Sequence, residues 1–192
     1  MANGSLPGWE RMRIEMTEKV NMKQLLIPLA LCMAAGQCPD AIAESKAMPA
    51  FERLKTLAGS WQGKDEDGQP ASATYEVTSG GTVVMEKLTP GKEACMVTMF
   101  HLDGDKLMVT HYCARNNQPR MRVENYDPKS NSLEFTYVDA TNLLKPEDGH
   151  MHGLTMKFPD KDHLIEDWNW KEGDQDAHAI FHFERPAVKS GH

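Results

Sequence analysis

The sequence predicts an all-β domain, an antiparallel up-and-down barrel of about ten strands preceded by one short helix. From Trp61 to Glu184, short segments rich in β-branched and aromatic residues follow one another at intervals of about 8 to 12 residues. Turn residues such as Asp-Gly, Gly-Gly and Asp-Pro pairs separate these segments. The gaps are too short for the crossovers that parallel strands need, so the sheet should be antiparallel.

Residues 1–43 have the composition of a secretory signal peptide. Lys23 leads into the apolar run Leu25–Gly36, and Ala41-Ile42-Ala43 places small residues at the expected cleavage positions before Glu44. The run has 12 residues, fewer than the roughly 20 that a transmembrane helix needs. We therefore expect an exported protein without a permanent transmembrane helix.

The start of translation and the form of the mature chain follow from the same region. Residues 1–21 place a charged, non-periodic segment ahead of the positive region, so Met16 or Met22 is an alternative start. A glutamine precedes Cys38, where a lipoprotein needs a small residue, and we expect no stable membrane anchor. The mature domain should cover residues 44–192 and be periplasmic or secreted.

The charge of the chain limits the classes of partner. The net charge is −7, and removing residues 1–43 takes away four basic and four acidic side chains, so it stays at −7. An acidic chain without a Lys/Arg cluster is a poor candidate for binding nucleic acid or an anionic membrane. A small-molecule ligand or a protein partner fits this composition better, and the sequence does not predict an oligomeric state.

One amphipathic helix is predicted directly before the first strand. Apolar residues recur there at three-residue intervals, with charged residues between them and Pro49 near the start. Gly59 ends the pattern. The apolar positions are Met48, Phe51, Leu54 and Leu57.

The strands that follow should form a meander that closes on itself. Closure hides the two edge strands, and barrels of this size commonly enclose one small ligand. A flat sandwich is the main alternative. The predicted strands lie near residues 60–66, 72–78, 82–88, 94–102, 106–113, 120–126, 132–139, 150–158, 163–170 and 176–184.

Residues at both ends of this meander resemble the signature of calycins, the group that includes lipocalins and fatty-acid-binding proteins. Gly59-Ser60-Trp61 opens the first strand and is similar to their Gly-x-Trp motif. Arg185 closes the last strand and looks like the calycin arginine that packs across this tryptophan. The resemblance covers about Leu57 to Arg185 and implies a lipocalin-like barrel with a structural role for Gly59, Trp61 and Arg185.

Two further stretches are similar to more specific groups. Leu57–Gly63 is similar to the opening of nitrobindin-like haem barrels and of uncharacterised secreted bacterial lipocalin-like families. Thr110–Cys113, together with Asn117–Met121, looks like one of those uncharacterised families. The nitrobindin likeness implies haem held by a histidine late in the chain, where His163, His178 and His182 lie.

Cys95 and Cys113 are candidates for a disulfide in an oxidising compartment. A three-residue hairpin loop at Asp103–Asp105 would pair Val97 with His111 and Cys95 with Cys113. Cysteines that face each other in this way are close enough to bridge. A change of one residue in the turn would separate them, and two free thiols are the alternative.

His150 and His152 are candidate metal ligands. In a regular strand they share one face about 7 Å apart, so both could bind one metal if another strand adds a third ligand. His111, Asp139 or Glu166 could supply it. A metal- or haem-dependent enzyme using this histidine pair is therefore an alternative function. The divalent metal or haem would be its cofactor.

The leading expectation is a binding protein that holds a hydrophobic or amphipathic small molecule in the barrel. Strand alternation places Tyr137 and Asp139 on one face, and Glu166 and Trp168 on another. No nucleophile elbow, phosphate-binding glycine loop or HExxH helix occurs, so we assign no catalytic residue. A structural barrel without ligand is the remaining alternative. The expected ligand-binding residues are His111, Tyr137, Asp139, His150, His152, Glu166 and Trp168.

Overall fold

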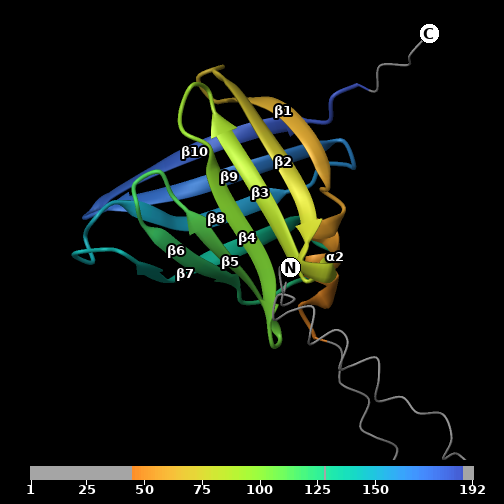
Figure 1. Cartoon of the computed structure of the whole chain (residues 1–192), viewed down its shortest axis with the longest axis horizontal. Coiled ribbons are helices and arrows are strands. Elements are labelled where there is room, and N and C mark those ends of the chain that lie inside the picture. The colour runs from red at the N-terminus through yellow and green to blue at the C-terminus, as the bar shows by residue number, and fades with distance from the viewer. Residues whose placement is uncertain (1–44, 128, 188–192) are drawn as a thin grey trace, which may run out of the picture. The chain divides into compact units, whose positions relative to one another are not determined.

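The computed structural model describes residues 45–127 and 129–187, which form a β-barrel with a short helix before it (Figure 1). Helix α2 spans Met48–Lys55, and the 3-10 turn η1 spans Ser79–Gly81. The strands are β1 Gly59–Asp65, β2 Pro70–Thr78, β3 Val83–Pro90, β4 Met96–Asp103, β5 Lys106–Tyr112, β6 Gln118–Val123, β7 Ser132–Thr141, β8 His150–Lys157, β9 His163–Glu172 and β10 Gln175–Glu184.

The ten strands form one closed barrel in which each strand pairs antiparallel with its neighbours in sequence. The barrel closes between its first and last strands, where Gln62 of β1 lies opposite Glu184 of β10. At this seam a Cβ on Gly63 would lie 2.0 Å from the carbonyl oxygen of His182, so only glycine allows the two backbones to approach. The predicted all-β, ten-stranded antiparallel barrel is confirmed, and the sandwich alternative is wrong.

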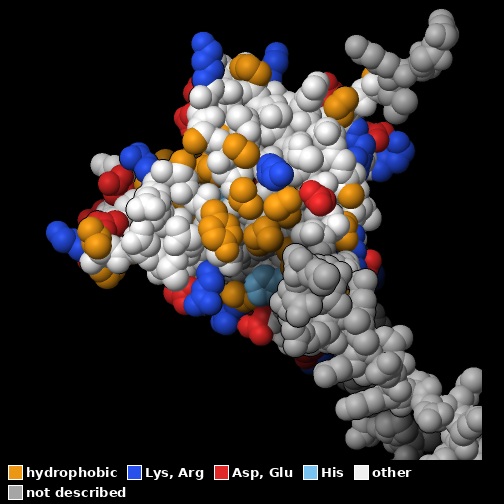
Figure 2. All heavy atoms as spheres, in the orientation of Figure 1, with side chains coloured by type: hydrophobic (Ala, Val, Ile, Leu, Met, Phe, Trp, Pro, Cys, Tyr) orange, Lys and Arg blue, Asp and Glu red, His pale blue; other side chains and the backbone are white. Residues whose placement is uncertain are grey.

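The core follows from the alternation of side chains along each strand. In β4, for example, Met96, Thr98 and Phe100 are buried, whereas the residues between them are half-buried on the outer side. Outward residues on β3 and β4 include Met85 and Met99, which lie opposite each other. Figure 2 shows hydrophobic side chains gathered on this outer face of β2, β3 and β4.

Helix α2 covers one end of the barrel. Phe51 and Leu54 are 2% and 0% exposed and belong to the same core as the barrel interior. The turn between β4 and β5 holds the segment before the helix, because Ser45 Oγ donates to the Gly104 carbonyl at 2.6 Å. The helix contacts β4 and β5, so this end of the barrel is closed.

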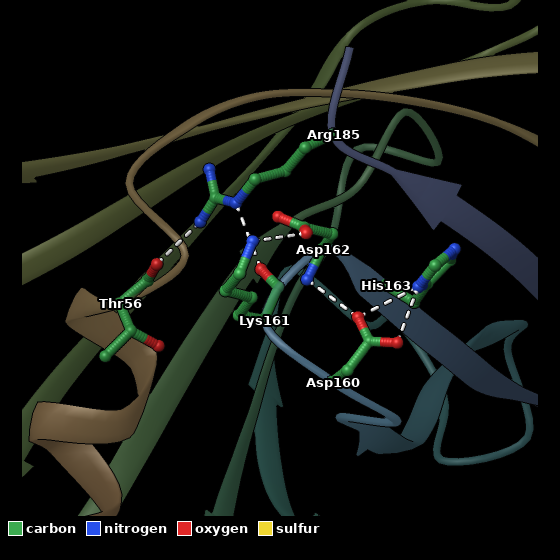
Figure 3. A network of polar contacts seen from close by, with 6 residues as sticks. All are labelled: Thr56, Asp160, Lys161, Asp162, His163 and Arg185. Atoms are coloured by element: carbon green, nitrogen blue, oxygen red, sulfur yellow. Dashed lines mark hydrogen bonds and ion pairs between the residues drawn. The ribbon is translucent and has the colours of Figure 1, made fainter. Parts of the chain in front are cut away.

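Arg185 ties the last strand to the segment between α2 and β1 (Figure 3). Its guanidinium donates to the carbonyls of Thr56 at 2.7 Å, Ala58 at 3.1 Å and Lys161 at 3.1 Å. The same group lies over the ring of Trp61, with Cζ 4.2 Å from the centroid. Trp61 is 1% exposed, so this contact seals the core beside the helix.

The two cysteines of the barrel do not form a disulfide. The β4–β5 turn contains two residues, Gly104 and Asp105, so that Val97 pairs with Tyr112 rather than with His111. This shift of one residue removes the predicted pairing, and Cys95 and Cys113 are free. The positive φ of 56° at Gly104 permits the shorter turn.

The predicted signal peptide, residues 1–43, lies outside the described residues. Nothing in the structure therefore tests the expected cleavage, the alternative start or the export of the chain. Over residues 45–127 and 129–187, no helix is both long and apolar enough to cross a membrane.

Candidate functional site

A cavity of about 270 Å³ opens at the end of the barrel opposite α2. Helix α2 lies beside the turn that ends β4, whereas the cavity is lined by Met96 at the start of that strand. β10 pairs with β9 over Gln175–Glu184 but with β1 only over Phe181–Glu184. The first half of β10 is therefore not covered by β1, and the cavity is lined by this half and by the β1–β2 turn.

The inner wall of the cavity is mostly apolar. It is lined by the buried side chains of Leu88, Met96, Trp168 and Phe181. Met151 adds a flexible side chain from β8. His111 of β5 is the polar exception among these buried residues, and its chemistry defines the candidate site.

In the described part of the chain, His111 has a hydrogen-bond partner at one ring nitrogen and none at the other. Nδ1 lies 3.0 Å from the hydroxyl of Thr98, and the ring lies against Trp168 with centroids 4.6 Å apart. Nε2 is buried and has no hydrogen-bond partner among the described residues. Burial lowers the pKa of His111 to about 4, so the ring is neutral at pH 7.

A buried carboxyl pair lies beside this histidine. The hydroxyl of Tyr75 contacts Glu86 Oε1 at 3.1 Å and also Glu166 Oε1. Glu166 Oε2 accepts a hydrogen bond of 3.0 Å from the indole nitrogen of Trp168. Both carboxyl groups are 0% exposed, so their ionisation is constrained by each other and by burial.

The pKa values of this pair indicate which member carries a proton. Burial, and then the charge of Glu166, raises the pKa of Glu86 well above its usual value. Burial also raises the pKa of Glu166, but hydrogen bonds from Tyr75 and Trp168 lower it. We therefore assign the proton to Glu86 and the negative charge to Glu166.

Sequence reasoning brought together three residues of this site but missed three others. His111, Glu166 and Trp168, all predicted ligand anchors, lie together inside the barrel. Tyr75, Glu86 and Thr98 were not predicted. A signal for Glu86 existed in the sequence, because it lies between Val84 and Leu88 in the inward row of β3.

Three other predicted anchors form a separate cluster of rings from β7 and β8. Tyr137 stacks on His152 with centroids 4.5 Å apart and contacts His150 at 4.8 Å. His150 Nε2 lies 3.1 Å from His152 Nδ1, and its Nδ1 lies 2.7 Å from the Asp148 carbonyl. Among the described residues that line the 270 Å³ cavity, none belongs to this cluster.

Asp139 lies on the outer surface, contrary to the predicted face. A β-bulge shifts the register so that Tyr137 faces Met121 while Asp139 faces Arg120. Val138 is the extra residue of the bulge, which turns Asp139 away from the interior. Asp139 forms an ion pair with Arg120, and both side chains are 47% exposed.

The histidine pair is not arranged as a metal chelate. Both ring nitrogens of His150 are engaged, one of them by His152 itself, so the pair does not offer two nitrogens to one ion. In residues 45–127 and 129–187, no three His, Cys, Asp or Glu side chains are grouped to hold a metal ion. The third ligands expected from His111, Asp139 or Glu166 lie elsewhere.

The late histidines do not provide the interior ligand that the haem expectation requires. His163 and His178 are exposed and contact Asp160 and Asp167, at 2.8 and 2.6 Å. His182 is exposed on the outer side of β10, between the inward residues Phe181 and Phe183. Of the three, His178 borders the mouth of the cavity, but it is exposed and its Nδ1 is engaged by Asp167.

Comparisons with known proteins add a likeness in fold. No protein-family model and no curated protein sequence matches the chain. A protein of unknown function from the DUF3598 family of Nostoc punctiforme is similar in structure, with a TM-score of 0.45 and 11% identity over 69% of this chain. The match covers 49% of the Nostoc chain, so this chain spans about half of that protein. A redesigned β-barrel is also similar, with a TM-score of 0.34 and 11% identity over 69% of this chain and 94% of its own.

Proposed function

We propose that the protein is an exported, lipocalin-like binding protein that holds a small amphipathic molecule in the cavity beside His111. The observation that carries the proposal is that His111, which lines a cavity of about 270 Å³, has a buried Nε2 without a hydrogen-bond partner among the described residues. The contact of Arg185 with Trp61 supports the calycin relationship. The composition of residues 1–43 supports export to the periplasm or the medium.

The energetic cost of leaving His111 Nε2 without a hydrogen bond favours a ligand with a polar group. A buried polar atom without a hydrogen bond destabilises a protein by about 1–3 kcal/mol. A ligand that hydrogen-bonds to His111 Nε2 removes this cost, and its apolar part can contact Trp168 and Leu88. Ligand pockets usually measure about 300–1,000 Å³. A cavity of 270 Å³ therefore suits a molecule with one ring or a short chain.

The hydrogen-bond chain behind His111 determines the kind of polar group. Thr98 lies opposite Glu86 in the sheet and 3.0 Å from His111 Nδ1, so its hydroxyl oxygen can accept a hydrogen bond from that nitrogen. We propose the tautomer in which Nδ1 carries the proton, because a neutral imidazole then has an acceptor lone pair at Nε2. The ligand should therefore carry a hydroxyl or N–H donor.

Calorimetric titration with two neutral probes tests the proposal. We expect 4-hydroxyphenethyl alcohol to bind at one site, with its phenol donating to His111 Nε2. 2-Phenylethanol lacks this donor and should bind about tenfold more weakly, as the loss of one hydrogen bond to a buried group predicts. His111→Leu should reduce the difference between the two probes.

A pair of variants on β10 tests whether the probes bind in the cavity. Ala179 lines the cavity, whereas Ala177, two residues away on the same side of the strand, is exposed and does not line it. Ala179→Phe should abolish binding and Ala177→Phe should leave it unchanged. The proposal fails if neither alcohol, nor the corresponding amine or carboxylate, binds saturably, or if Ala179→Phe binds as the wild type does.

A further inference from the structure

We infer that the ligand is a small amine, with its positive charge at the acidic mouth of the cavity and its hydrogen-bond donor at His111. This inference rests on the proposed function and names the chemical class of its ligand. It follows from the unlike chemistry of the two ends of the cavity, the outer one acidic and the inner one neutral.

The mouth of the cavity carries four acidic side chains and no lysine or arginine. Asp65 ends β1, Glu66 and Asp67 lie in the turn that follows it, and Glu93 comes from the connection between β3 and β4. Within the described residues, none of these four carboxylates forms an ion pair with a basic side chain. Their charges therefore remain available to a cation that enters the cavity.

Other charged neighbours do not neutralise this mouth. Lys64 and Lys92 adjoin the acidic residues in sequence but do not line the cavity. His178 lines the mouth, and its Nδ1 contacts Asp167 at 2.6 Å. Asp65 Oδ1 accepts a hydrogen bond from the Gln69 backbone, which positions the carboxylate on the turn.

The inner end of the cavity supplies an independent indication of a ligand. His111 is 0% exposed and lines the cavity, and its Nε2 has no hydrogen-bond partner among the described residues. The ring is neutral, because burial lowers its pKa to about 4, so it does not repel a cationic molecule. A molecule between the two ends would meet an acceptor inside and carboxylates outside.

The position of the charge follows from solvation. Moving an ammonium group into the apolar interior is costly, whereas at the mouth it stays partly hydrated and meets carboxylates. A single exposed ion pair adds little affinity, but several carboxylates together can raise it about tenfold. The net charge of −7 also favours the approach of a cation over that of an anion.

Three probes with the same ring test the charge of the ligand: 4-hydroxyphenethylamine, 4-hydroxyphenethyl alcohol and 4-hydroxyphenylacetate. At low salt we expect the amine to bind about tenfold more tightly than the alcohol, and the carboxylate to bind most weakly. The preference should shrink in about 0.5 M NaCl, because salt screens exposed charges. Affinities come from calorimetric titration of the purified protein.

Two triple variants of equal net charge test whether the preference for the amine comes from the carboxylates at the mouth or from the overall charge of the protein. Glu66→Gln/Asp67→Asn/Glu93→Gln removes acidic groups of the mouth, and we expect the amine to lose its advantage while the alcohol binds unchanged. Glu76→Gln/Glu134→Gln/Glu184→Gln neutralises exposed residues outside the cavity lining and should keep the preference. All six side chains are exposed, so both variants should fold.

The outcomes distinguish the inference from the function on which it rests. If the alcohol binds in the cavity and the amine binds no more tightly, or if both triple variants behave alike, the charge assignment is wrong and the binding function stands. If none of the three probes binds saturably, the proposed function fails as well.

Discussion

The two ends of the barrel are built from different interactions. At the α2 end, Phe51, Leu54 and Trp61 are each at most 2% exposed, and Arg185 joins the helix segment, β10 and the β8–β9 turn. At the opposite end the interior contains a cavity, an unpartnered histidine nitrogen and a protonated carboxyl group. The comparison indicates that the α2 end stabilises the barrel, whereas the cavity end keeps buried polar groups that lower its stability.

The largest expected difference between the ends concerns apolar packing. Leu54→Ala should lower the free energy of unfolding by about 4 kcal/mol, because it leaves a hole in a filled core. Ile180→Ala, at the mouth of the cavity, should lower it by less than about 1 kcal/mol, since this half-buried side chain already borders open space. Urea denaturation of both variants measures the difference. Equal losses would contradict the division between a filled end and an open end.

The pH dependence of stability should reveal the buried histidine. The pKa of His111 is about 4 in the folded protein and about 6.5 when unfolded. The unfolded chain therefore binds the proton more readily, so stability is lost as the pH falls from about 6.5 to about 4, by about 3 kcal/mol. His111→Gln should lack this loss, whereas the exposed His182→Gln should retain it. A wild-type slope in His111→Gln would show that another group causes the loss.

Two arginines allow hydrogen bonds that join distant segments to be compared with a surface ion pair. Arg185→Met removes three hydrogen bonds to backbone carbonyls and the contact with Trp61, so it should destabilise the protein by about 2 kcal/mol. Arg120→Met removes only the half-exposed pair with Asp139 and should cost less than about 1 kcal/mol. Thermal melts at fixed pH compare the two, and a larger loss for Arg120→Met would reverse the interpretation.

The smallest expected effect distinguishes the two buried carboxyl groups. The raised pKa of Glu86 means that the folded state keeps a proton which the unfolded state releases, so stability falls as the pH rises above the usual carboxyl pKa. Glu86→Gln should flatten this fall and gain about 1 kcal/mol at pH 9 relative to the wild type. Urea denaturation between pH 6 and pH 9 measures the slope.

Glu166→Gln is the matched variant, and we expect it to change the free energy of unfolding in the opposite direction. Glu166 accepts hydrogen bonds from Tyr75 and Trp168 on its two oxygens, and a glutamine would place an NH₂ group against one of these donors. We expect it to destabilise the protein at every pH. If Glu86→Gln were the more destabilising of the two, our assignment of the proton would be wrong.

Much of the fold could be predicted because it depends on local patterns. Alternation along the strands and the short turns between them account for ten antiparallel strands, and the position of Trp61 before a long meander anticipated the closing seam with β10. The face shared by Glu166 and Trp168 was predicted correctly, since β9 runs without a bulge between them. These features require only the period of a strand and the chemistry of turns.

Features that depend on a shift of one residue could not be predicted in this way. The two-residue turn at Gly104 separated Cys95 from Cys113, and the bulge at Val138 turned Asp139 outward. A second bulge at His152 accompanies the contact between His150 and His152. Each of these irregularities reverses which side chains meet, and the strand pattern does not reveal them.

The sequence by itself determined that this chain forms an antiparallel barrel with a short helix before its first strand and an acidic net charge. Only the tertiary structure decided that Tyr75, Glu86, Thr98 and His111, from four different strands, form one connected cluster with Glu166 and Trp168 inside the barrel. The physical reason is that strand periodicity acts between near neighbours, whereas the lining of a cavity depends on the register of every strand pair around the closed barrel.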